Sequence, residues 1–457
     1  MGHPCMPRLF VCGDDTLNKN TPAEATSETD FATDVITLGP QAIVSEAPES
    51  RSGVHILGNP AYPAICYGAW RSDVRESGPL VPTIAQQKED LKIMAAMGIK
   101  ILRTYNTQCF IGLDGKSNTE NLLTAIAELM AEDESFEMYL MLGVWVQALG
   151  AYTDAVDKST EDALTNRAEM DKAIELAKAY PEIIKVIAIG NEAMVDWQEH
   201  DLPIRFILGY VNELQALKAS GDINNAIWIT SSDNHAVWAG TDSNAANQIT
   251  DLNALIAAVD YISLHTYPFH DTYHNNDFWF VDEDKTDFTD KEKVDAAMVR
   301  AIDRAIKEFK AAQCYMLSLG INKPIHIGET GWASETNELY GIEGSKAADE
   351  YKQKIFYDAM STWSNEFGAS LFFFEAFDEP WKGGADNPGD SEKHFGLIDI
   401  NSQAKYVIWE RVDNGIFDDL TRLGMKITKT FNGNEHCILE SVLVPDVVLT
   451  KGNKRED

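Results

Sequence analysis

The chain has 457 residues, of which 44% are hydrophobic, and its 72 acidic and 38 basic side chains give a formal net charge of −34. This charge argues against nucleic acid as a partner, because nucleic-acid binding depends on Lys and Arg meeting phosphates. It argues equally against anionic membranes and acidic polysaccharides, whereas a neutral ligand is unaffected. No apolar run approaches the roughly 20 residues of a membrane-spanning helix, so we expect no transmembrane segment.

The first 63 residues precede the regular part of the chain. Residues 9–15, LFVCGDD, resemble the end of a bacterial lipoprotein signal, with Cys12 as the residue to be lipidated; an ordinary irregular terminus is the alternative. Residues 14–34 are rich in Thr, Asp, Glu, Asn and Ala, which predicts a disordered N-terminal spacer over residues 1–34. Residues 35–63 carry short apolar runs broken by Gly and Pro, which predicts an N-terminal extension or cap.

From residue 64 onward, short strand-like runs alternate with helical patterns. A capping box at Thr83–Gln86 opens the first helix and Gly98 can end it. Further helical patterns run through residues 122–130, 164–177, 294–309 and 351–359. The eight predicted strands are Ala64–Trp70, Ile99–Tyr105, Met138–Val146, Val186–Ile189, Ala226–Ser231, Tyr261–His265, Ile325–Gly328 and Ser370–Glu375.

Eight strands alternating with helices predict an α/β fold, the (β/α)₈ TIM barrel, over residues 64–412. A doubly wound open sheet is the alternative. The first strand is followed by CYGAWR, which has one Gly where a nucleotide-binding loop would have several, and this weakens that alternative. Residues 413–457 form a C-terminal tail of mixed character to which the sequence assigns no structure.

Two of the predicted strands lead directly into a carboxylate. Glu192 and Glu329 follow short apolar strands, and the C-terminal strand ends of such a barrel face its active site. Trp145, Tyr267, Trp332 and Trp381 also fall near predicted strand ends, and aromatic faces stack on sugar rings. Paired carboxylates among aromatic rings favour glycoside hydrolysis; the alternative is that each Glu pairs with a basic residue on the rim.

Five segments together resemble glycoside hydrolase family 17, the β-1,3-glucanases and related transglucosylases. The resemblance covers most of the chain from about residue 64 to 399, and GNE followed by GETGW is its most specific part. The chain departs from the family at Ala333, where Pro is common, and in the long loop of residues 265–290. The five segments are IKILRTYN, GNEAM, DYISLHTYPF, GETGWAS and FFFEAFDEPWK.

The resemblance implies a retaining mechanism with Glu329 as nucleophile and Glu192 as general acid/base. It also implies that Asn191 binds the sugar 2-hydroxyl group and that Arg103 and Tyr267 orient the nucleophile. The remaining expected substrate-binding residues are Tyr105, Trp145, Trp332, Glu379, Trp381 and Lys382, with Trp332 and Trp381 as sugar platforms and Glu379 and Lys382 as the Glu-x-x-Lys pair of the family.

These observations predict a retaining enzyme that cleaves a neutral β-1,3-glucan polysaccharide or oligosaccharide, without cofactor or metal and as a monomer. We expect it to act outside the cytoplasm of a bacterium, in the extracellular space, in the periplasm or anchored to the cell surface. The alternatives are a β-1,3-glucan transglucosylase that uses the same residues, a non-catalytic β-glucan-binding protein and a metal-dependent barrel hydrolase.

Other polar clusters have a simpler interpretation. His265, His270, Asp271, His274 and Asp277 suggest a metal site, but their spacing matches no known motif, so a polar loop wall is preferred. Asp386–Asp390 lacks the full ligand set of a calcium loop, which favours a turn. Cys66 and Cys109 could meet in a disulfide, although buried thiols are preferred.

Overall fold

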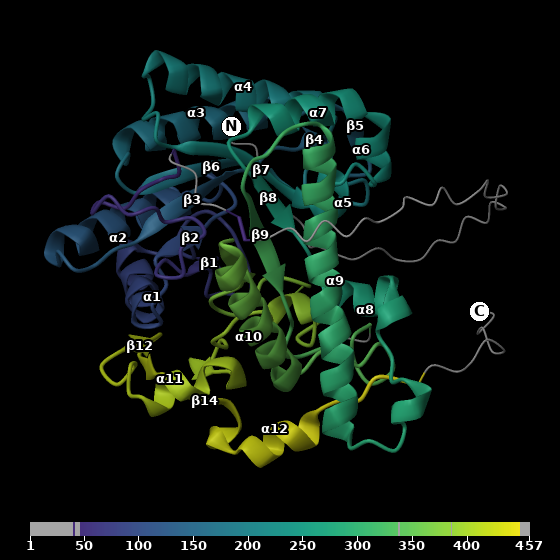
Figure 1. Cartoon of the computed structure of the whole chain (residues 1–457). Helices are drawn as coiled ribbons and strands as arrows, with labels where there is room; N and C mark the ends of the chain where they lie inside the picture. The colour runs from purple at the N-terminus through teal and green to yellow at the C-terminus, as the bar shows by residue number, and fades with distance from the viewer. Residues whose placement is uncertain (1–39, 42–45, 337–338, 385, 448–457) are drawn as a thin grey trace, which may run out of the picture.

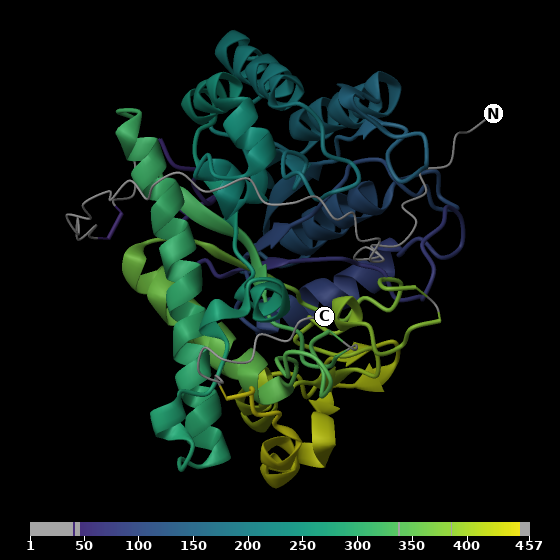
Figure 2. The same cartoon turned by 90° about the vertical axis from the view of Figure 1, so that its right-hand side faces the viewer.

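The structure of the protein, a computed structural model, describes residues 40–41, 46–336, 339–384 and 386–447 (Figures 1 and 2). The predicted spacer of residues 1–34, with Cys12, lies outside the described residues. In the part of the chain that is described, no helix combines the length and the apolar character needed to cross a membrane.

Eight parallel strands close into a barrel at the centre of the molecule (Figure 1). Around the barrel the order is β1, β2, β3, β6, β7, β8, β9 and β10, and β1 pairs with both β2 and β10. The predicted TIM barrel is therefore confirmed, and the open-sheet alternative is wrong. The strands are β1 Ala64–Cys66, β2 Ile101–Arg103, β3 Tyr139–Val144, β6 Ile184–Asn191, β7 Trp228–Asn234, β8 Ile262–His265, β9 Ile325–Gly331 and β10 Leu371–Phe374.

Each predicted strand is present, with bounds that differ by a few residues. The first strand ends at Cys66 and not at Trp70, although the Tyr67 amide still donates to the Arg103 carbonyl at 3.0 Å. The seventh strand runs beyond its predicted end at Gly328 and carries Glu329 within the sheet. Glu329 is thus held by strand pairing and not by a loop.

The helices surround the barrel. The five predicted helices are present, and the capping box between Thr83 and Gln86 is confirmed. Helices α4 and α7 were not singled out from the sequence. The helices of seven or more residues are α1 Ile84–Ala96, α2 Asn118–Glu132, α3 Ala163–Ala179, α4 Ile204–Ser220, α7 Ile249–Ala258, α8 Pro268–His274, α9 Asp290–Ser318, α10 Glu350–Phe367 and α12 Glu435–Ser441. The shorter elements are β4 Ala148–Leu149, β5 Asp157–Glu161, α5 His235–Trp238, α6 Ser243–Asn247, β11 Gln403–Ala404, α11 Trp409–Asp413, β12 Thr421–Arg422, β13 Met425–Lys426 and β14 Thr428–Lys429.

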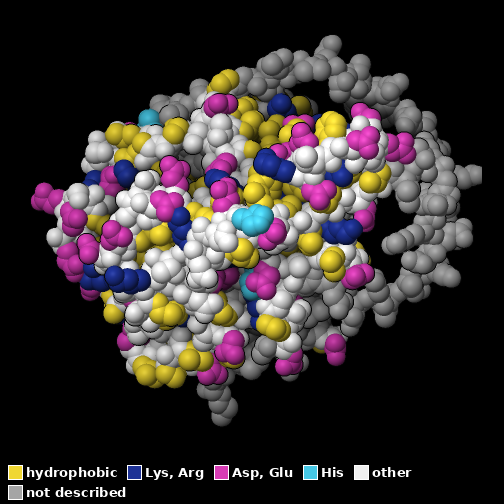
Figure 3. Space-filling view, turned by 90° about the horizontal axis from the view of Figure 1, so that it is seen from below, with side chains coloured by type: hydrophobic (Ala, Val, Ile, Leu, Met, Phe, Trp, Pro, Cys, Tyr) yellow, Lys and Arg dark blue, Asp and Glu magenta, His cyan; other side chains and the backbone are white. Residues whose placement is uncertain are grey.

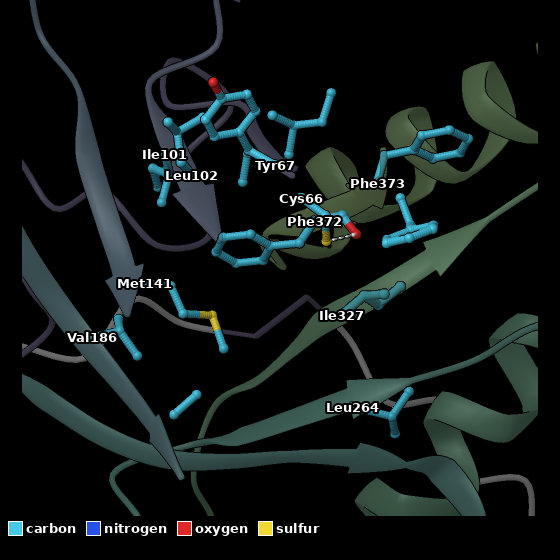
Figure 4. Close-up of a cluster of buried hydrophobic side chains, with 14 of the residues drawn as sticks. Cys66, Tyr67, Ile101, Leu102, Met141, Val186, Leu264, Ile327, Phe372 and Phe373 are labelled. Carbon is cyan, nitrogen blue, oxygen red and sulfur yellow. Dashed lines mark hydrogen bonds between the residues drawn. The ribbon is translucent and has the colours of Figure 1, made fainter. Parts of the chain in front are cut away.

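The barrel strands contribute a cluster of buried apolar side chains (Figure 4). Cys66 lies in this cluster, with its Sγ 3.7 Å from the Phe372 carbonyl oxygen. Burial raises the pKa of this thiol well above its usual value. Cys66 is a free thiol, so the Cys66–Cys109 disulfide is not formed and the preferred interpretation of Cys66 as a buried thiol is confirmed.

The segment before the barrel lies against the N-terminal ends of its strands. The Gln41 side chain donates to the Ile325 carbonyl at 2.9 Å, at the start of β9. Gly58 donates to Ser370 Oγ at 2.8 Å, just before β10, and Trp228 at the start of β7 donates to the Glu46 carbonyl at 2.9 Å. These contacts cover one end of the barrel and leave the opposite end, where the strands finish, for the loops.

The C-terminal tail packs beside α1, at the lower end of the molecule in Figure 1. Arg422 in β12 is buried, and its Nε lies 2.9 Å from Asp90 Oδ1 of α1. The same carboxylate receives the Arg71 guanidinium at 2.6 Å and the Tyr67 hydroxyl at 3.0 Å. Because a buried carboxylate needs such donors, this network fastens the tail to the barrel.

We expect Arg422→Ala to lower the free energy of unfolding by about 2–4 kcal/mol, because it removes one partner of a buried ion pair while Arg71 remains. Urea unfolding followed by circular dichroism measures the change. Lys426→Ala, an exposed position of the neighbouring strand β13, is the matched control and should stay within about 0.5 kcal/mol of wild type. Equal stability of the two variants would contradict the role assigned to this network.

Candidate active site

Glu329 lies on β9 and is held by donors from two other strand ends. Arg103 Nη1 and the Tyr105 hydroxyl each lie 2.7 Å from Glu329 Oε2, and the Tyr267 hydroxyl lies 2.7 Å from Oε1. Burial alone would raise the pKa of Glu329, but the Arg103 guanidinium and the hydrogen bonds from the two tyrosine hydroxyls outweigh burial and hold the pKa below its usual value. The structure therefore keeps Glu329 ionised.

Glu192 follows β6 in a backbone conformation that is unusual for its residue type. Its φ is 47°, in the left-handed region, and the preceding Gly190 has a φ of 80°. This turn directs the carboxylate to two partners: Gln198 Nε2 donates to Oε2 at 2.7 Å, and His265 Nδ1 lies 3.0 Å from Oε1. A strained residue held in this way is typical of a functional site.

The two carboxylates lie close together across the barrel mouth. One oxygen of Glu192, one oxygen of Glu329 and one ring nitrogen of His265 are all within 4.8 Å of one another. Among the described residues, this is the one group of three or more His, Cys, Asp and Glu side chains near enough to share a metal ion. The Glu329 oxygens, however, are already occupied by a guanidinium and two hydroxyls, which suits a reacting carboxylate better than a metal ligand.

Arg103 connects Glu329 to Asn191. The guanidinium is buried, and its second amino group donates to Asn191 Oδ1 at 2.6 Å. Asn191 is the last residue of β6 and directly precedes Glu192. The side chain of Arg103 therefore holds both the Asn191 amide, which precedes Glu192, and the Glu329 carboxylate.

Trp145 lies half-buried after β3, next to this amide. Its ring stacks on His200 at 4.6 Å between centroids, and His200 Nε2 lies 2.8 Å from the Asn191 carbonyl oxygen. Burial lowers the pKa of His200 to about 4, so this imidazole is neutral at pH 7. Trp145 is thus held at the edge of the site, in a position where it could contact a ligand.

Glu379, Trp381 and Lys382 lie in the loop after β10. Lys382 Nζ is 3.4 Å from Glu379 Oε2, and both side chains are buried. The absence of a side chain at Gly68 makes room for them, because a Cβ there would lie 1.7 Å from Glu379 Oε1. The Arg75 guanidinium covers one face of the Trp381 ring, 3.2 Å from its centroid.

Trp332 is not a sugar platform. Its side chain is 0% exposed, and its Nε1 donates to the Ala347 carbonyl oxygen at 2.9 Å. The rings of Phe269, Trp279 and Phe356 pack around it at 5.2–5.7 Å. The prediction for this residue is wrong because its side chain points into the core behind the strand end.

Three residues of the site were not predicted to belong to it: His265, Gln198 and Ser232. His265 could be assigned to the site once the strand register is known, because it pairs with Glu329 across β8 and β9. Ser232 likewise pairs with Asn191 across β6 and β7. Gln198 gives no such signal, because it lies in the irregular segment after Glu192.

The other residues of the suspected metal cluster are engaged elsewhere. His270 Nδ1 lies 2.9 Å from the Tyr340 hydroxyl, and Arg304 pairs with both Asp271 and Asp277. These contacts agree with the preferred interpretation of a polar loop wall. Figure 3 views the molecule from below the orientation of Figure 1, and acidic side chains are spread over this face with Lys and Arg scattered among them.

A closed barrel with two carboxylates at the ends of β6 and β9 defines a glycoside hydrolase type of site. Residues 64–396 match the family described as the BtgE/BtgC glycoside hydrolase domain, and the chain belongs to this family. The resemblance to glycoside hydrolase family 17 is thereby confirmed.

The solved structures include a similar protein over most of the chain. An endo-laminarinase from Formosa Hel1_33_131 is 48% identical, with a TM-score of 0.82, and the match covers 89% of this chain and 100% of that one. Among curated proteins, a glucan 1,3-beta-glucosidase of Arthroderma benhamiae is 37% identical over 19% of this chain. A putative glucan endo-1,3-beta-glucosidase btgC of Aspergillus niger is 24% identical over 74% of this chain. The chain spans 28% and 42% of the lengths of these two relatives.

We expect the Glu329 carboxyl to titrate at a higher pH in Tyr267→Phe than in wild type, because the variant loses a donor that stabilises the carboxylate. Carbon-13 NMR of glutamate-labelled protein measures this titration directly. Tyr210→Phe, which removes a hydroxyl that bonds Glu161 of β5, is the control and should leave Glu329 unchanged. An unchanged Glu329 titration in Tyr267→Phe would contradict this account of its ionisation.

Proposed function

We propose that the protein is a retaining glycoside hydrolase that cleaves β-1,3-glucan, with Glu329 as nucleophile and Glu192 as general acid/base. The observation that carries this proposal is that one oxygen of Glu192 and one oxygen of Glu329 lie within 4.8 Å of each other, which supports the closer of two known spacings. Retaining enzymes place their carboxyl groups about 5–5.5 Å apart, whereas inverting enzymes need roughly 6.5–9.5 Å to admit a water molecule. The ionised state of Glu329 also suits a nucleophile.

The reaction has two steps. In the first, a Glu329 oxygen attacks the anomeric carbon, the bond to the leaving oxygen breaks and Glu192 gives that oxygen its proton. In the second, Glu192 takes a proton from water as the water oxygen attacks the anomeric carbon and releases Glu329. The sugar leaves with its original anomeric configuration.

The surrounding side chains have supporting roles in this proposal. Arg103, Tyr105 and Tyr267 orient Glu329, and Asn191 binds the 2-hydroxyl group of the sugar. Trp145 and Trp381 contact sugar rings. The Glu379–Lys382 pair binds sugar hydroxyl groups or braces the loop that does so.

A neutral β-1,3-glucan such as laminarin is the proposed substrate. The 48% identity to an endo-laminarinase over the full length of that chain supports this choice. The net charge of −34 is compatible with a neutral polysaccharide and unfavourable to an acidic one. We propose that the enzyme acts as a monomer outside the cytoplasm of a bacterium, without cofactor or metal.

Transfer of the glucosyl group to a second sugar is the alternative outcome of the same two steps. The side chain of Trp197 supports this transfer reaction. It is 60% exposed, and Trp197 directly precedes Gln198, whose side chain donates a hydrogen bond to Glu192. An aromatic ring on this side of the site could hold an acceptor sugar. Products longer than the starting oligosaccharide would assign the protein to the transglucosylases.

The proposal is tested by incubation with β-1,3-, β-1,4- and mixed-linkage glucans, with products sized over time. Proton NMR of the first products reports their anomeric configuration. We expect cleavage of β-1,3-glucan with initial release of the β-anomer. Initial release of the α-anomer would exclude retention, and glucan binding without any products would favour a non-catalytic binding protein.

We expect Glu329→Ala to lower turnover of laminarin by at least about 10⁴-fold, because it removes the nucleophile, while binding of laminarin persists. Azide should restore release of an activated aryl glycoside by attacking from the vacated side. Glu335→Ala, six residues away with a largely exposed side chain, is the control and should keep wild-type turnover. Undiminished turnover in Glu329→Ala would refute the assignment.

Treatment with EDTA followed by desalting should leave the rate of laminarin cleavage unchanged, because the protein's own Arg103, Tyr105 and Tyr267 already satisfy the Glu329 carboxylate. Rates are compared with a mock-treated sample and after addition of Zn²⁺ or Mg²⁺. Loss of activity that a metal restores would support the metal-dependent alternative.

A further inference from the structure

A row of buried hydrogen-bonding groups leads away from Glu192 into the barrel. His265 Nδ1 lies 3.0 Å from Glu192 Oε1, and its Nε2 lies 2.7 Å from Ser232 Oγ. Ser232 Oγ in turn lies 2.8 Å from Ser263 Oγ. The imidazole and both serines are fully buried, so water does not supply these hydrogen bonds in their place.

The two serine hydroxyls occupy space that a glycine on β9 leaves open. A Cβ at position 328 would lie 1.9 Å from Ser263 Oγ and 2.7 Å from Ser232 Oγ. Gly328 directly precedes Glu329, so the hydroxyl pair lies beneath the strand that carries the other carboxylate. The glycine at position 328 thus leaves room for both hydroxyls beside β9.

A neutral imidazole donates from one ring nitrogen and accepts at the other, and the partner of one nitrogen decides the role of the other. If Ser232 donates to Nε2, the proton of His265 is on Nδ1 and points to Glu192 Oε1. If Ser232 accepts from Nε2, then Nδ1 is an acceptor and draws the proton of Glu192 onto Oε1.

The two oxygens of Glu192 are not equivalent. Oε1 faces the fully buried imidazole, whereas Oε2 accepts a hydrogen bond from Gln198, which is half-buried. A proton on Oε1 would be held in a hydrogen bond to the buried imidazole and withheld from a leaving group. General acid catalysis needs the proton on the oxygen that substrate can reach.

We propose that Ser232, supported by Ser263, is a positioning residue that holds His265 as the Nδ1–H tautomer and so keeps the acid proton of Glu192 on Oε2. The inference rests on the proposed function, because it assigns how the general acid is kept ready for the first step. It adds a role for three residues that neither contact the anomeric carbon nor stand in the paired-carboxylate motif.

The tautomer can be observed without any reaction. Nitrogen-15 NMR of histidine-labelled protein at pH 7–8 distinguishes protonated from unprotonated ring nitrogens, and the loss of one signal set in His265→Asn identifies His265. We expect Nδ1 to carry the proton in wild type, and Nε2 to gain it in part in Ser232→Ala. A wild-type His265 with its proton on Nε2, or on both nitrogens, would overturn the proposal.

The kinetic consequence depends on the leaving group. For laminarin, whose leaving oxygen must be protonated, we expect Ser232→Ala to lower kcat/KM by about 10²-fold. For a dinitrophenyl β-laminaribioside, whose leaving group needs no proton, we expect a change of less than about 3-fold. A merely structural role would lower both rates together, and that result would also overturn the proposal.

Ser231→Ala is the matched control. Ser231 precedes Ser232 on β7, is equally buried, and its hydroxyl has no hydrogen-bond partner among the described residues. We expect it to change neither the tautomer nor either rate, and Ser263→Ala to give a weaker form of the Ser232→Ala result. If wild type cleaves neither substrate, the proposed function fails, whereas a fully active Ser232→Ala on laminarin refutes only the positioning role.

Discussion

The buried ion pair between Arg103 and Glu329 is the interaction on which the site depends. Removing a guanidinium and a carboxylate from water costs several kcal/mol for each ion, and their attraction offsets part of that cost. Two further hydrogen bonds from the Arg103 amino groups go to the Gly328 carbonyl and the Asn191 amide oxygen. One side chain on β2 therefore fixes the geometry of β6 and β9 at their ends. The Arg103 pKa is raised above its already high value although burial opposes this, because neighbouring anionic groups favour its charge.

A third carboxyl group at the barrel mouth shows how the charges of the site are balanced. Glu375 is fully buried after β10, and neither of its oxygens has a hydrogen-bond partner among the described residues. Burial and the nearby Glu379 raise its pKa well above the usual value, which favours the neutral form. The cations Arg103 and Lys382 then face the anions Glu329 and Glu379. A negative charge on Glu375 would compete with Glu329 for Arg103, and the neutral form of Glu375 does not compete.

The sequence predicted the barrel because each strand is a short run of buried apolar residues that ends in polar ones. It predicted the paired carboxylates because Glu192 and Glu329 each break such a run. It failed at Trp332, since an aromatic residue after a strand can point outward to a ligand or inward to the core. Only packing decides between the two, and here Phe269 and Phe356 enclose the ring.

The hydrogen bonds to Glu192 lay beyond prediction for a different reason. His265, Ser232 and Gln198 acquire their roles through strand register and through the path of a loop, neither of which a single sequence reveals. His265 was singled out from the sequence only as one member of a cluster of histidines and aspartates after the sixth strand. In the structure it turns away from them and toward Glu192.

The strained backbone of Glu192 fits the same physical account. A non-glycine residue in the left-handed region costs roughly 1–2 kcal/mol, and the fold must supply that energy. The Glu192 amide donates to the Ser232 carbonyl at 3.0 Å, and the Met194 amide donates to Asp233 Oδ2 at 2.8 Å. Both acceptors lie on β7, the strand that also supplies the hydroxyl of Ser232 to His265. Strand β7 therefore does two things: it accepts the hydrogen bonds that compensate the strain of Glu192, and it supplies the hydroxyl that orients His265. The position of the Glu192 carboxylate and the placement of its proton thus depend on the same strand.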